Sequence, residues 1–256
     1  MPGSKMTIQD CRPAETRMQG FTLIELMLVM VILSLTCAAI FSQIGQIQQR
    51  AVAEQGKIED FQQARDFVDQ IFRDTRQLGY PNVRNFDVST GTWSTPLIND
   101  HRLAAGLVKA TSAELRFEGD VDGSGNVSII SYMINGNGNC ANCLQRAQAV
   151  KVDGDPVTGQ TNLTSSSYTT EIQNVKNTAS IFSVYDSAGS AITLPIDIDN
   201  NASAVSGVKT IQANLTVSNP NVVDLKTGQP LEADVAETIQ IVNCSMAVTG
   251  ATLTCQ

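Results

Sequence analysis

The stretch GFTLIELMLVMVILSLTCAAIF, residues 20–41, is dominated by apolar residues and carries one charged residue, Glu25. From Phe21 onward it spans about 21 residues, and a helix rising about 1.5 Å per residue covers the roughly 30 Å hydrocarbon core of a bilayer over that length. A carboxylate at bilayer depth costs about 2.5–3.5 kcal/mol on insertion scales. The sequence therefore predicts a membrane-spanning helix in which Glu25 needs a partner of opposite charge.

The segment in front of this stretch has the charge of a cytoplasmic leader. Residues 1–20 include Lys5, Arg12 and Arg17 and end at Gly20, directly before the apolar run. A secretory signal peptide has its small-residue cleavage site after its apolar run, not before it. We therefore expect residues 1–20 to be a leader that is removed in front of the membrane segment, with an uncleaved signal anchor as the alternative.

Together these residues resemble the type IV prepilin superfamily, whose signature is a glycine, a methylatable phenylalanine and a glutamate at the fifth mature position. Gly20, Phe21 and Glu25 meet that signature. The resemblance implies that a prepilin peptidase cuts between Gly20 and Phe21 and that Phe21 is N-methylated. It also implies that Glu25 pairs, during assembly, with the N-terminal amine of a neighbouring subunit.

A helical pattern continues beyond the predicted span. Residues 21–41 form its transmembrane half, and residues 42–79 form an amphipathic half that ends at Gly79 before Pro81. We expect one helix from Phe21 to Leu78. The apolar positions recur at three- and four-residue steps: Ile44, Ile47, Ala51, Ile58, Phe61, Ala64, Val68, Ile71, Phe72 and Leu78.

Residues 80–256 change to a period of two. Leu115 and Phe117 alternate with Arg116 and Glu118, and residues 130–134 and 211–217 alternate similarly, which predicts strands with one buried face. Residues 153–180 are rich in Ser, Thr and Asn and are expected to form a surface loop or a small hairpin. The predicted fold class is α+β and pilin-like, with a long N-terminal helix packed on an antiparallel β-sheet head.

Several details resemble PilW-type minor pilins of the type IV pilus. They are the helix end from Arg73 to Tyr80, the predicted hairpin around Asp120 and a late strand at residues 237–243. The alternative is the J-type pseudopilin of type II secretion, which shares the leader, the helix and a β-rich head. The resemblance implies a structural subunit that primes pilus assembly at or near the filament tip and contributes to adhesion or motility.

The resemblance also implies a location and a set of partners. The subunit is first a single-pass inner-membrane protein with its basic leader in the cytoplasm and its head in the periplasm, and then part of the surface pilus fibre. Its partners are other minor and major pilins, the prepilin peptidase, the inner-membrane assembly platform and, in systems that have one, a tip adhesin. The chain carries a net charge of -8, so nucleic acid is not an expected partner.

Six cysteines require assignment. Cys11 lies in the leader and Cys37 in the membrane helix. A head in an oxidising compartment is expected to hold disulfides, and the remaining four cysteines allow three pairings. Cys244 with Cys255, as in many pilins, leaves Cys140 with Cys143 as a tight local loop; zinc binding and redox activity are the alternatives for these four residues.

A run of oxygen-bearing side chains is a candidate calcium site. Asp120, Asp122, Ser124 and Asn126 stand at alternate positions, as in the first half of an EF-hand loop. The second half of the EF-hand pattern is not met, because Ser131 stands at the twelfth position, where the loop needs a bidentate glutamate. A glycine-rich hairpin turn without a metal is the alternative interpretation.

Nothing in the sequence indicates an enzyme or a cofactor. His101 is the only histidine and has no recognisable nucleophile and carboxylate pattern around it, so we expect a surface histidine. Two carboxylate pairs, Asp153 with Asp155 and Asp197 with Asp199, lie in loop-like sequence and are interpreted as solvated charges. Aromatic residues make up only 5% of the chain, which disfavours a sugar- or base-stacking cleft.

Overall fold

The structure is a computed structural model, in which the chain forms two compact units, residues 1–50 and residues 51–256. The residues that the structure describes are 22–82, 85, 97–135, 138, 140–156, 159, 162–223, 227–243, 246–249 and 252–255.

Helix α1 runs from Leu23 to Arg76 and is 54 residues long. It begins and ends within two residues of the predicted bounds. Gly79 adopts a positive φ of 76°, a conformation that glycine reaches without steric cost, and its amide donates to the Glu118 carbonyl at 2.9 Å. The chain therefore leaves the helix by turning onto a strand of the head.

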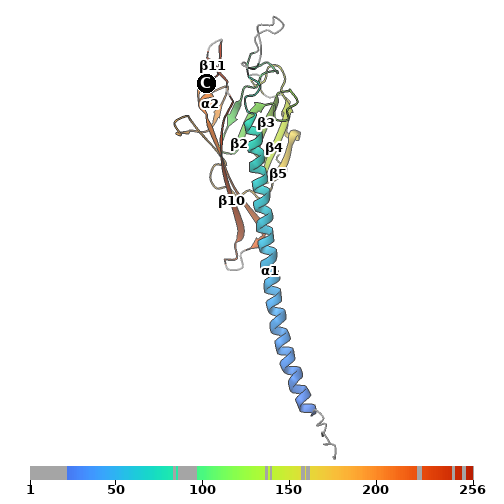
Figure 1. Cartoon of the computed structure of the whole chain (residues 1–256). Helices are drawn as coiled ribbons and strands as arrows, with labels where there is room; N and C mark the ends of the chain where they lie inside the picture. The colour runs from blue at the N-terminus through green and yellow to red at the C-terminus, as the bar shows by residue number, and fades with distance from the viewer. Residues whose placement is uncertain are drawn as a thin grey trace, which may run out of the picture. The chain divides into compact units, whose positions relative to one another are not determined.

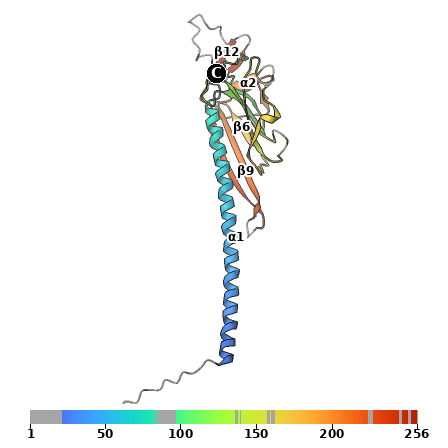
Figure 2. The ribbon, with the colours of Figure 1, turned by 90° about the vertical axis from the view of Figure 1, so that its right-hand side faces the viewer.

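In the second unit, the helix buries apolar side chains only near its C-terminal end. Ala64, Phe67, Val68 and Ile71 are buried and belong to the core of the head. The earlier positions of the predicted stripe, such as Ile58 and Phe61, remain exposed. Figures 1 and 2 show the C-terminal part of α1 beside the sheets of the head.

The first sheet has six antiparallel strands in the order β5-β4-β3-β2-β1-β8. Strands β2 and β3 pair in register, with Phe117 opposite Ile130 and Leu115 opposite Tyr132. The strands of this sheet are β1 (Leu107–Ala110), β2 (Glu114–Gly119), β3 (Ser128–Ile134), β4 (Leu144–Val150), β5 (Tyr168–Ile172) and β8 (Ile196–Asp197).

The second sheet has four antiparallel strands in the order β10-β9-β6-β7, and a third sheet is the hairpin of β11 and β12. The remaining elements are β6 (Phe182–Tyr185), β7 (Ala191–Ile192), β9 (Thr210–Val223), β10 (Pro230–Gln240), β11 (Met246–Thr249), β12 (Thr252–Cys255), the 3-10 helix η3 (Ser165–Ser167) and the short helix α2 (Ala202–Gly207). The predicted α+β class with a long helix and antiparallel sheets is confirmed.

The alternation predicted for residues 211–217 is also confirmed. Ile211, Ala213, Leu215 and Val217 are buried in the core, and the residues between them are partly exposed. This is the pattern expected when one face of a strand packs inward and the other meets water.

Two expectations about the head differ from the structure. Glu118, predicted to lie on a solvent face, is fully buried because Lys151 and the segment around Leu103 cover that face of the sheet. Residues 153–180 contain β5, which pairs with β4 as an edge strand of the six-stranded sheet. Backbone hydrogen bonds stabilise such an edge strand, so a Thr-rich sequence can form it without a strong apolar pattern.

The end of α1 is fixed to the six-stranded sheet by a polar contact and a close backbone approach. Asp74 Oδ2 accepts a hydrogen bond from the Tyr132 hydroxyl at 2.6 Å and another from Arg146 Nε at 2.8 Å. Leu78 forms a bridge with Gly119 of β2, where a Cβ atom would lie 2.3 Å from the Gln77 carbonyl oxygen. Only glycine fits at this crossing.

Candidate assembly site

Glu25 lies in the first turn of α1, where its carboxylate and Thr22 form reciprocal hydrogen bonds. The Glu25 amide donates to Thr22 Oγ1 at 3.3 Å, and Thr22 donates from its amide and its hydroxyl to Glu25 Oε2 at 3.5 and 3.4 Å. This is the arrangement of a capping box. The Thr-x-x-Glu spacing is the sequence signal of this box, and it gives Glu25 a second role that we did not predict.

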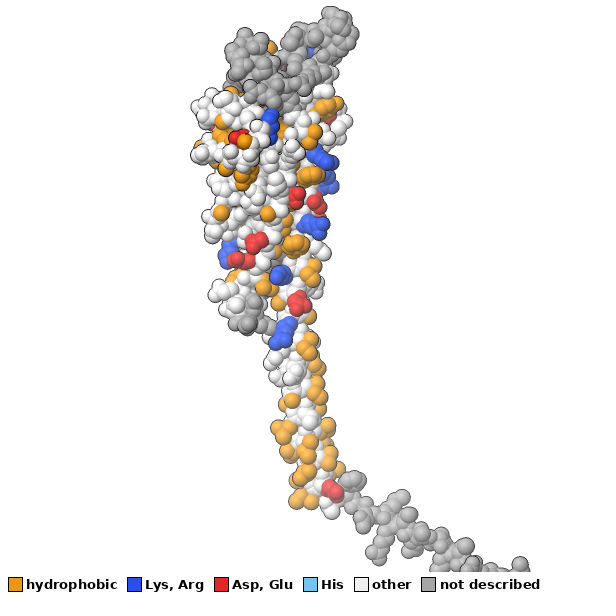
Figure 3. All heavy atoms as spheres, turned by 60° about the vertical axis from the view of Figure 1, so that its left-hand side comes forward, with side chains coloured by type: hydrophobic (Ala, Val, Ile, Leu, Met, Phe, Trp, Pro, Cys, Tyr) orange, Lys and Arg blue, Asp and Glu red, His pale blue; other side chains and the backbone are white. Residues whose placement is uncertain are grey.

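The surroundings of Glu25 are apolar and open. Large apolar side chains of residues 23–35 are each 53% to 75% exposed, and Figure 3 shows hydrophobic side chains covering the visible face of this part of the helix. An 18-residue window of α1 has a mean hydropathy of 2.5, so this helix is long and apolar enough to cross a membrane. In water so much exposed apolar surface is unfavourable, whereas in lipid or in a helix bundle it is covered.

The chemistry available to Glu25 follows from these surroundings. Its capping interactions with Thr22 hold the carboxylate near the start of the helix, where the positive end of the helix dipole favours a negative charge. A cationic group that reaches this turn can pair with it in an apolar environment. Gly20 and Phe21, the predicted processing residues, lie outside the described residues.

The cysteines of the head fall into two groups. Cys140 and Cys143 are joined by a disulfide in the loop between β3 and β4. Cys244 lies outside the described residues, so its pairing with Cys255 in β12 remains a prediction. Cys37 is a free, exposed cysteine in the apolar part of α1.

The four residues of the calcium candidate lie in the turn between β2 and β3. Asp120 is buried at the end of β2, whereas Asp122, Ser124 and Asn126 are exposed. Ser131, at the position of the missing glutamate, is buried in β3 and accepts a hydrogen bond from the Tyr168 hydroxyl at 2.9 Å. The structure thus brings the first four residues into one turn and excludes Ser131 from it.

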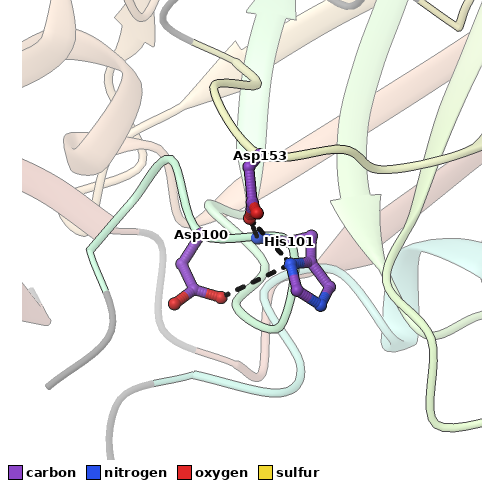
Figure 4. Close-up of side chains that lie close together, drawn as sticks. All are labelled: Asp100, His101 and Asp153. Carbon is purple, nitrogen blue, oxygen red and sulfur yellow. Dashed lines mark hydrogen bonds and ion pairs between the residues drawn. The ribbon is translucent and has the colours of Figure 1, made fainter. Parts of the chain in front are cut away.

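A second polar cluster, which the sequence analysis did not find, joins Asp100, His101 and Asp153. Their ligand atoms lie within 4.8 Å of one another. Figure 4 shows the Asp100 and Asp153 side chains beside His101. His101 is exposed as expected, and its Nδ1 lies 2.7 Å from Asp153 Oδ1. Both Asp100 oxygens accept hydrogen bonds from Arg102.

These bonds account for the charge states in the cluster. The Arg102 side chain is the main cause of the lowered pKa of Asp100, and the His101 amide is the main cause of the lowered pKa of Asp153. The carboxylates are thus ionised and already hydrogen-bonded within the chain. The cluster links the segment before β1 to the turn after β4.

The predicted carboxylate pairs, Asp153 with Asp155 and Asp197 with Asp199, differ in burial and in hydrogen bonding. Asp153 is exposed, but Asp155 is fully buried and accepts a hydrogen bond from the Val152 amide at 3.2 Å. The interpretation of Asp155 as a solvated charge is therefore wrong, because the turn folds over it. Asp197 binds the Asn200 side chain, which contributes most to its lowered pKa.

An α+β head on a long helix with an apolar N-terminal part is the layout of a pilin-like protein. Residues 16–41 match the prokaryotic N-terminal methylation motif, which is the leader motif of type IV prepilins. No curated protein and no solved structure matches the chain. The motif supports a membrane-anchored type IV pilin-like or pseudopilin protein, and it is a structural motif rather than an enzyme family.

Proposed function

We propose that this chain is a minor pilin of a type IV pilus, a structural subunit that primes assembly and sits at or near the filament tip. The observation that carries the proposal is the position of Glu25, a single carboxylate in the first turn of α1, whose first part, residues 23–41, is otherwise uncharged and exposed. Such a helix is suited to a bundle of helices, and its carboxylate is suited to a cationic partner there.

The proposed sequence of events begins in the inner membrane. The prepilin peptidase removes residues 1–20 and Phe21 becomes the methylated N-terminus, as the leader motif implies. The subunit then enters a helical bundle, where the N-terminal amine of a neighbour neutralises Glu25 and so offsets the cost of burying it. Assembly is thereby coupled to charge neutralisation.

Exposed apolar residues beyond the span support the same role. Ile44, Ile47, Val52, Ile58 and Phe61 are each 42% to 66% exposed on α1. Neighbouring pilin helices would cover these side chains and remove their apolar surface from water. Free subunits leave that surface exposed, so the free energy gained from covering it favours the filament.

The size of the head supports a position at the tip. The described head contains three sheets, and its β9–β10 hairpin has strands of 14 and 11 residues. A subunit repeated along the whole fibre must fit against copies of itself, whereas a tip subunit leaves its head free to meet another minor pilin or an adhesin.

Glu25→Ala tests the pairing. We expect the variant to insert into the membrane at least as well as the wild type, because the costly charge is gone, and to be depleted at least tenfold from sheared pili. Glu54→Ala is the matched control, since Glu54 is an exposed acid of the same helix outside the apolar segment. Equal recovery of wild type and Glu25→Ala in sheared pili would refute the pairing.

The processing step has its own test. Replacing Gly20 by a large residue should leave a membrane species about 20 residues longer, because the peptidase must approach a backbone that has no side chain at that position. Mass spectrometry of the wild-type protein should show a methylated Phe21 terminus. An intact Met1 terminus would contradict the processing.

Gene deletion with immunogold labelling separates the minor pilin from the J-type pseudopilin. We expect deletion to abolish or sharply reduce surface pili, and tagged protein to lie at low density near filament ends. Intact pili with exoproteins trapped in the periplasm would instead identify the pseudopilin. Labelling along the whole fibre at major-subunit density would overturn the tip position.

A further inference from the structure

The turn between β2 and β3 collects four oxygen-bearing side chains. Strand β2 ends at Gly119 and β3 begins at Ser128, and the turn between them includes Asp120, Asp122, Ser124 and Asn126. Gly123 and Gly125 both have positive φ, 68° and 82°, which lets the chain fold tightly around these side chains.

Asp120 is the feature of this turn that points to a ligand. It is only 7% exposed, and its Oδ2 accepts a hydrogen bond from the Gly125 amide at 3.0 Å, which directs the carboxylate into the turn. Its Oδ1 is also buried and has no hydrogen-bond partner in the part of the chain that the structure describes. A buried carboxylate oxygen without a donor is costly, and a bound cation removes that cost.

A second carboxylate, that of Asp122, belongs to the same turn. Asp122 is exposed and accepts a hydrogen bond from the Ser124 amide at 3.0 Å. Two carboxylates in one short turn repel each other, and a bound cation offsets that repulsion.

Two described cationic side chains, Arg102 and Lys151, line the same hollow of about 280 Å³ as Gly125 and Asn126. The Arg102 guanidinium is bound to both oxygens of Asp100, at 2.9 Å from Nε and 2.6 Å from the terminal nitrogen. The Lys151 ammonium donates to Glu118 and to two backbone carbonyl oxygens. Within the described part of the chain, neither Asp120 nor Asp122 forms an ion pair, so the negative charge of the turn is available to an ion from solution.

We propose that this turn binds a calcium ion, with Asp120 and Asp122 as the charged ligands and the Ser124 and Asn126 side-chain oxygens as neutral ligands. All four offer hard oxygen atoms, which Ca²⁺ accepts in flexible arrangements, whereas Mg²⁺ demands near-ideal octahedral geometry and gives up its waters reluctantly. Ser131, at the position of the last EF-hand ligand, already accepts a hydrogen bond within the sheet, so it does not coordinate the ion. Water molecules complete the coordination shell instead. With two charged ligands, we expect a Kd of roughly 0.1–1 mM, the range of extracellular calcium modules.

Calcium bound here would rigidify the junction between helix and sheet. The Asp120 amide donates to the Tyr80 carbonyl at 2.9 Å, so the residue that holds the ion also fixes the chain just after α1. This role is independent of the filament position proposed above.

Isothermal titration calorimetry of the full chain in detergent with CaCl₂ tests the proposal. We expect one site with a Kd of roughly 0.1–1 mM, weakened at least tenfold in Asp122→Asn and in Asp120→Asn. Asp122 is exposed, so its variant keeps the test valid if the buried Asp120 variant fails to fold. Asp186→Asn is the matched control, because Asp186 caps the turn between β6 and β7 in the same way, accepting from the Ala188 and Ser190 amides, and should leave the affinity unchanged.

Three results would overturn the proposal. The first is no binding heat up to about ten times the expected Kd. The second is equal affinity for Mg²⁺, which would contradict the choice of calcium. The third is unchanged affinity in Asp122→Asn together with loss of binding in His101→Ala, which would move the ion to the cluster of Asp100, His101 and Asp153.

Discussion

Lys151 and Glu118 form an ion pair in which both side chains are fully buried, with Nζ 2.7 Å from Oε2. The same Nζ donates to the carbonyl oxygens of Ile98 at 2.8 Å and Leu103 at 2.7 Å, so all three of its donors are used. Glu118 Oε2 also accepts from the Ala105 amide at 2.9 Å. The pair thereby fixes the segment before β1 onto strand β2.

We expect Lys151→Met to destabilise the head by about 3–5 kcal/mol, because it leaves the Glu118 carboxylate buried without its cation. Urea unfolding of the full chain in detergent, followed by far-UV circular dichroism, measures the change. The double variant Lys151→Met/Glu118→Gln should be less destabilised than Lys151→Met, because neither residue of the pair then carries a charge.

Lys176→Met is the control for this prediction. Lys176 pairs with Glu232 at 3.2 Å, but both side chains are about half exposed, so we expect a change of only about 0–1 kcal/mol. If the two lysine substitutions lower the free energy of unfolding equally, burial does not explain the contribution of the Lys151–Glu118 pair to stability.

The hydroxyl of Tyr132 predicts a dependence of stability on alkaline pH. Burial, and then the charge of Asp74, raise the pKa of Tyr132 far above its ordinary value of 10. Above pH 10 the unfolded chain therefore loses this proton while the native chain keeps it, so stability falls as pH rises, by up to about 1.4 kcal/mol per pH unit from this group. Below pH 10 neither state ionises and the contribution is constant.

Tyr132→Phe should remove that part of the alkaline slope. At pH 7 the variant should be less stable by about 1.5–3 kcal/mol, because Asp74 loses a donor to a charged oxygen. Urea unfolding midpoints at pH 7 measure the loss of stability, and midpoints between pH 10 and 11 measure the alkaline slope. An identical alkaline slope in wild type and variant would contradict the assignment to Tyr132.

Gly119→Ala should destabilise the junction of helix and sheet. The new Cβ would lie 2.3 Å from the Gln77 carbonyl oxygen, a backbone atom that cannot move without shifting the end of α1. We expect a loss of about 1–3 kcal/mol, the usual cost of overpacking, in a thermal or urea unfolding experiment.

Gly207→Ala provides the comparison for Gly119→Ala. Gly207 ends the short helix α2, and a Cβ there would meet nothing within 4 Å. This substitution should be close to neutral. A stable Gly119→Ala variant would mean that the crossing of Leu78 and Gly119 is looser than the structure indicates.

The C-terminal cysteines give a covalent prediction. The β11–β12 hairpin places Met246 opposite Cys255, and Cys244 lies two residues before Met246 in the sequence. Nonreducing peptide mapping of periplasmic material should recover Cys244 joined to Cys255, a closed loop worth about 3 kcal/mol. Free thiols at both positions would refute the pairing, and stoichiometric zinc would support the metal alternative.

The N-terminal part of the protein, up to Gly79, follows almost entirely from local sequence. The run from Phe21 to Phe41 is long and apolar enough to form a helix wherever it finds lipid, and the leader motif depends on consecutive residues around Gly20 and Phe21. The termination of α1 near Gly79 is equally local, because glycine and proline act through their own backbone conformations. The existence of strands β2, β3 and β9 was predicted for the same reason, since a period of two is typical of a strand. The single buried face holds for β9, whereas Glu118 of β2 and Ser131 of β3 are buried on the face predicted to meet water.

Only the tertiary structure decided which polar residues are buried and what they contact. Glu118 and Lys151 are 33 residues apart and both look like surface charges in the sequence, yet packing of the segment around Leu103 encloses them together. The edge strand β5 has a weak apolar pattern and forms because β4 offers it backbone partners. The orientation of Asp120 toward Gly125, with Oδ1 lacking a donor among the described residues, likewise depends on how the β2–β3 turn closes against the chain after α1. These features arise from contacts between residues distant in sequence, and the energies of such contacts are not encoded in any local pattern.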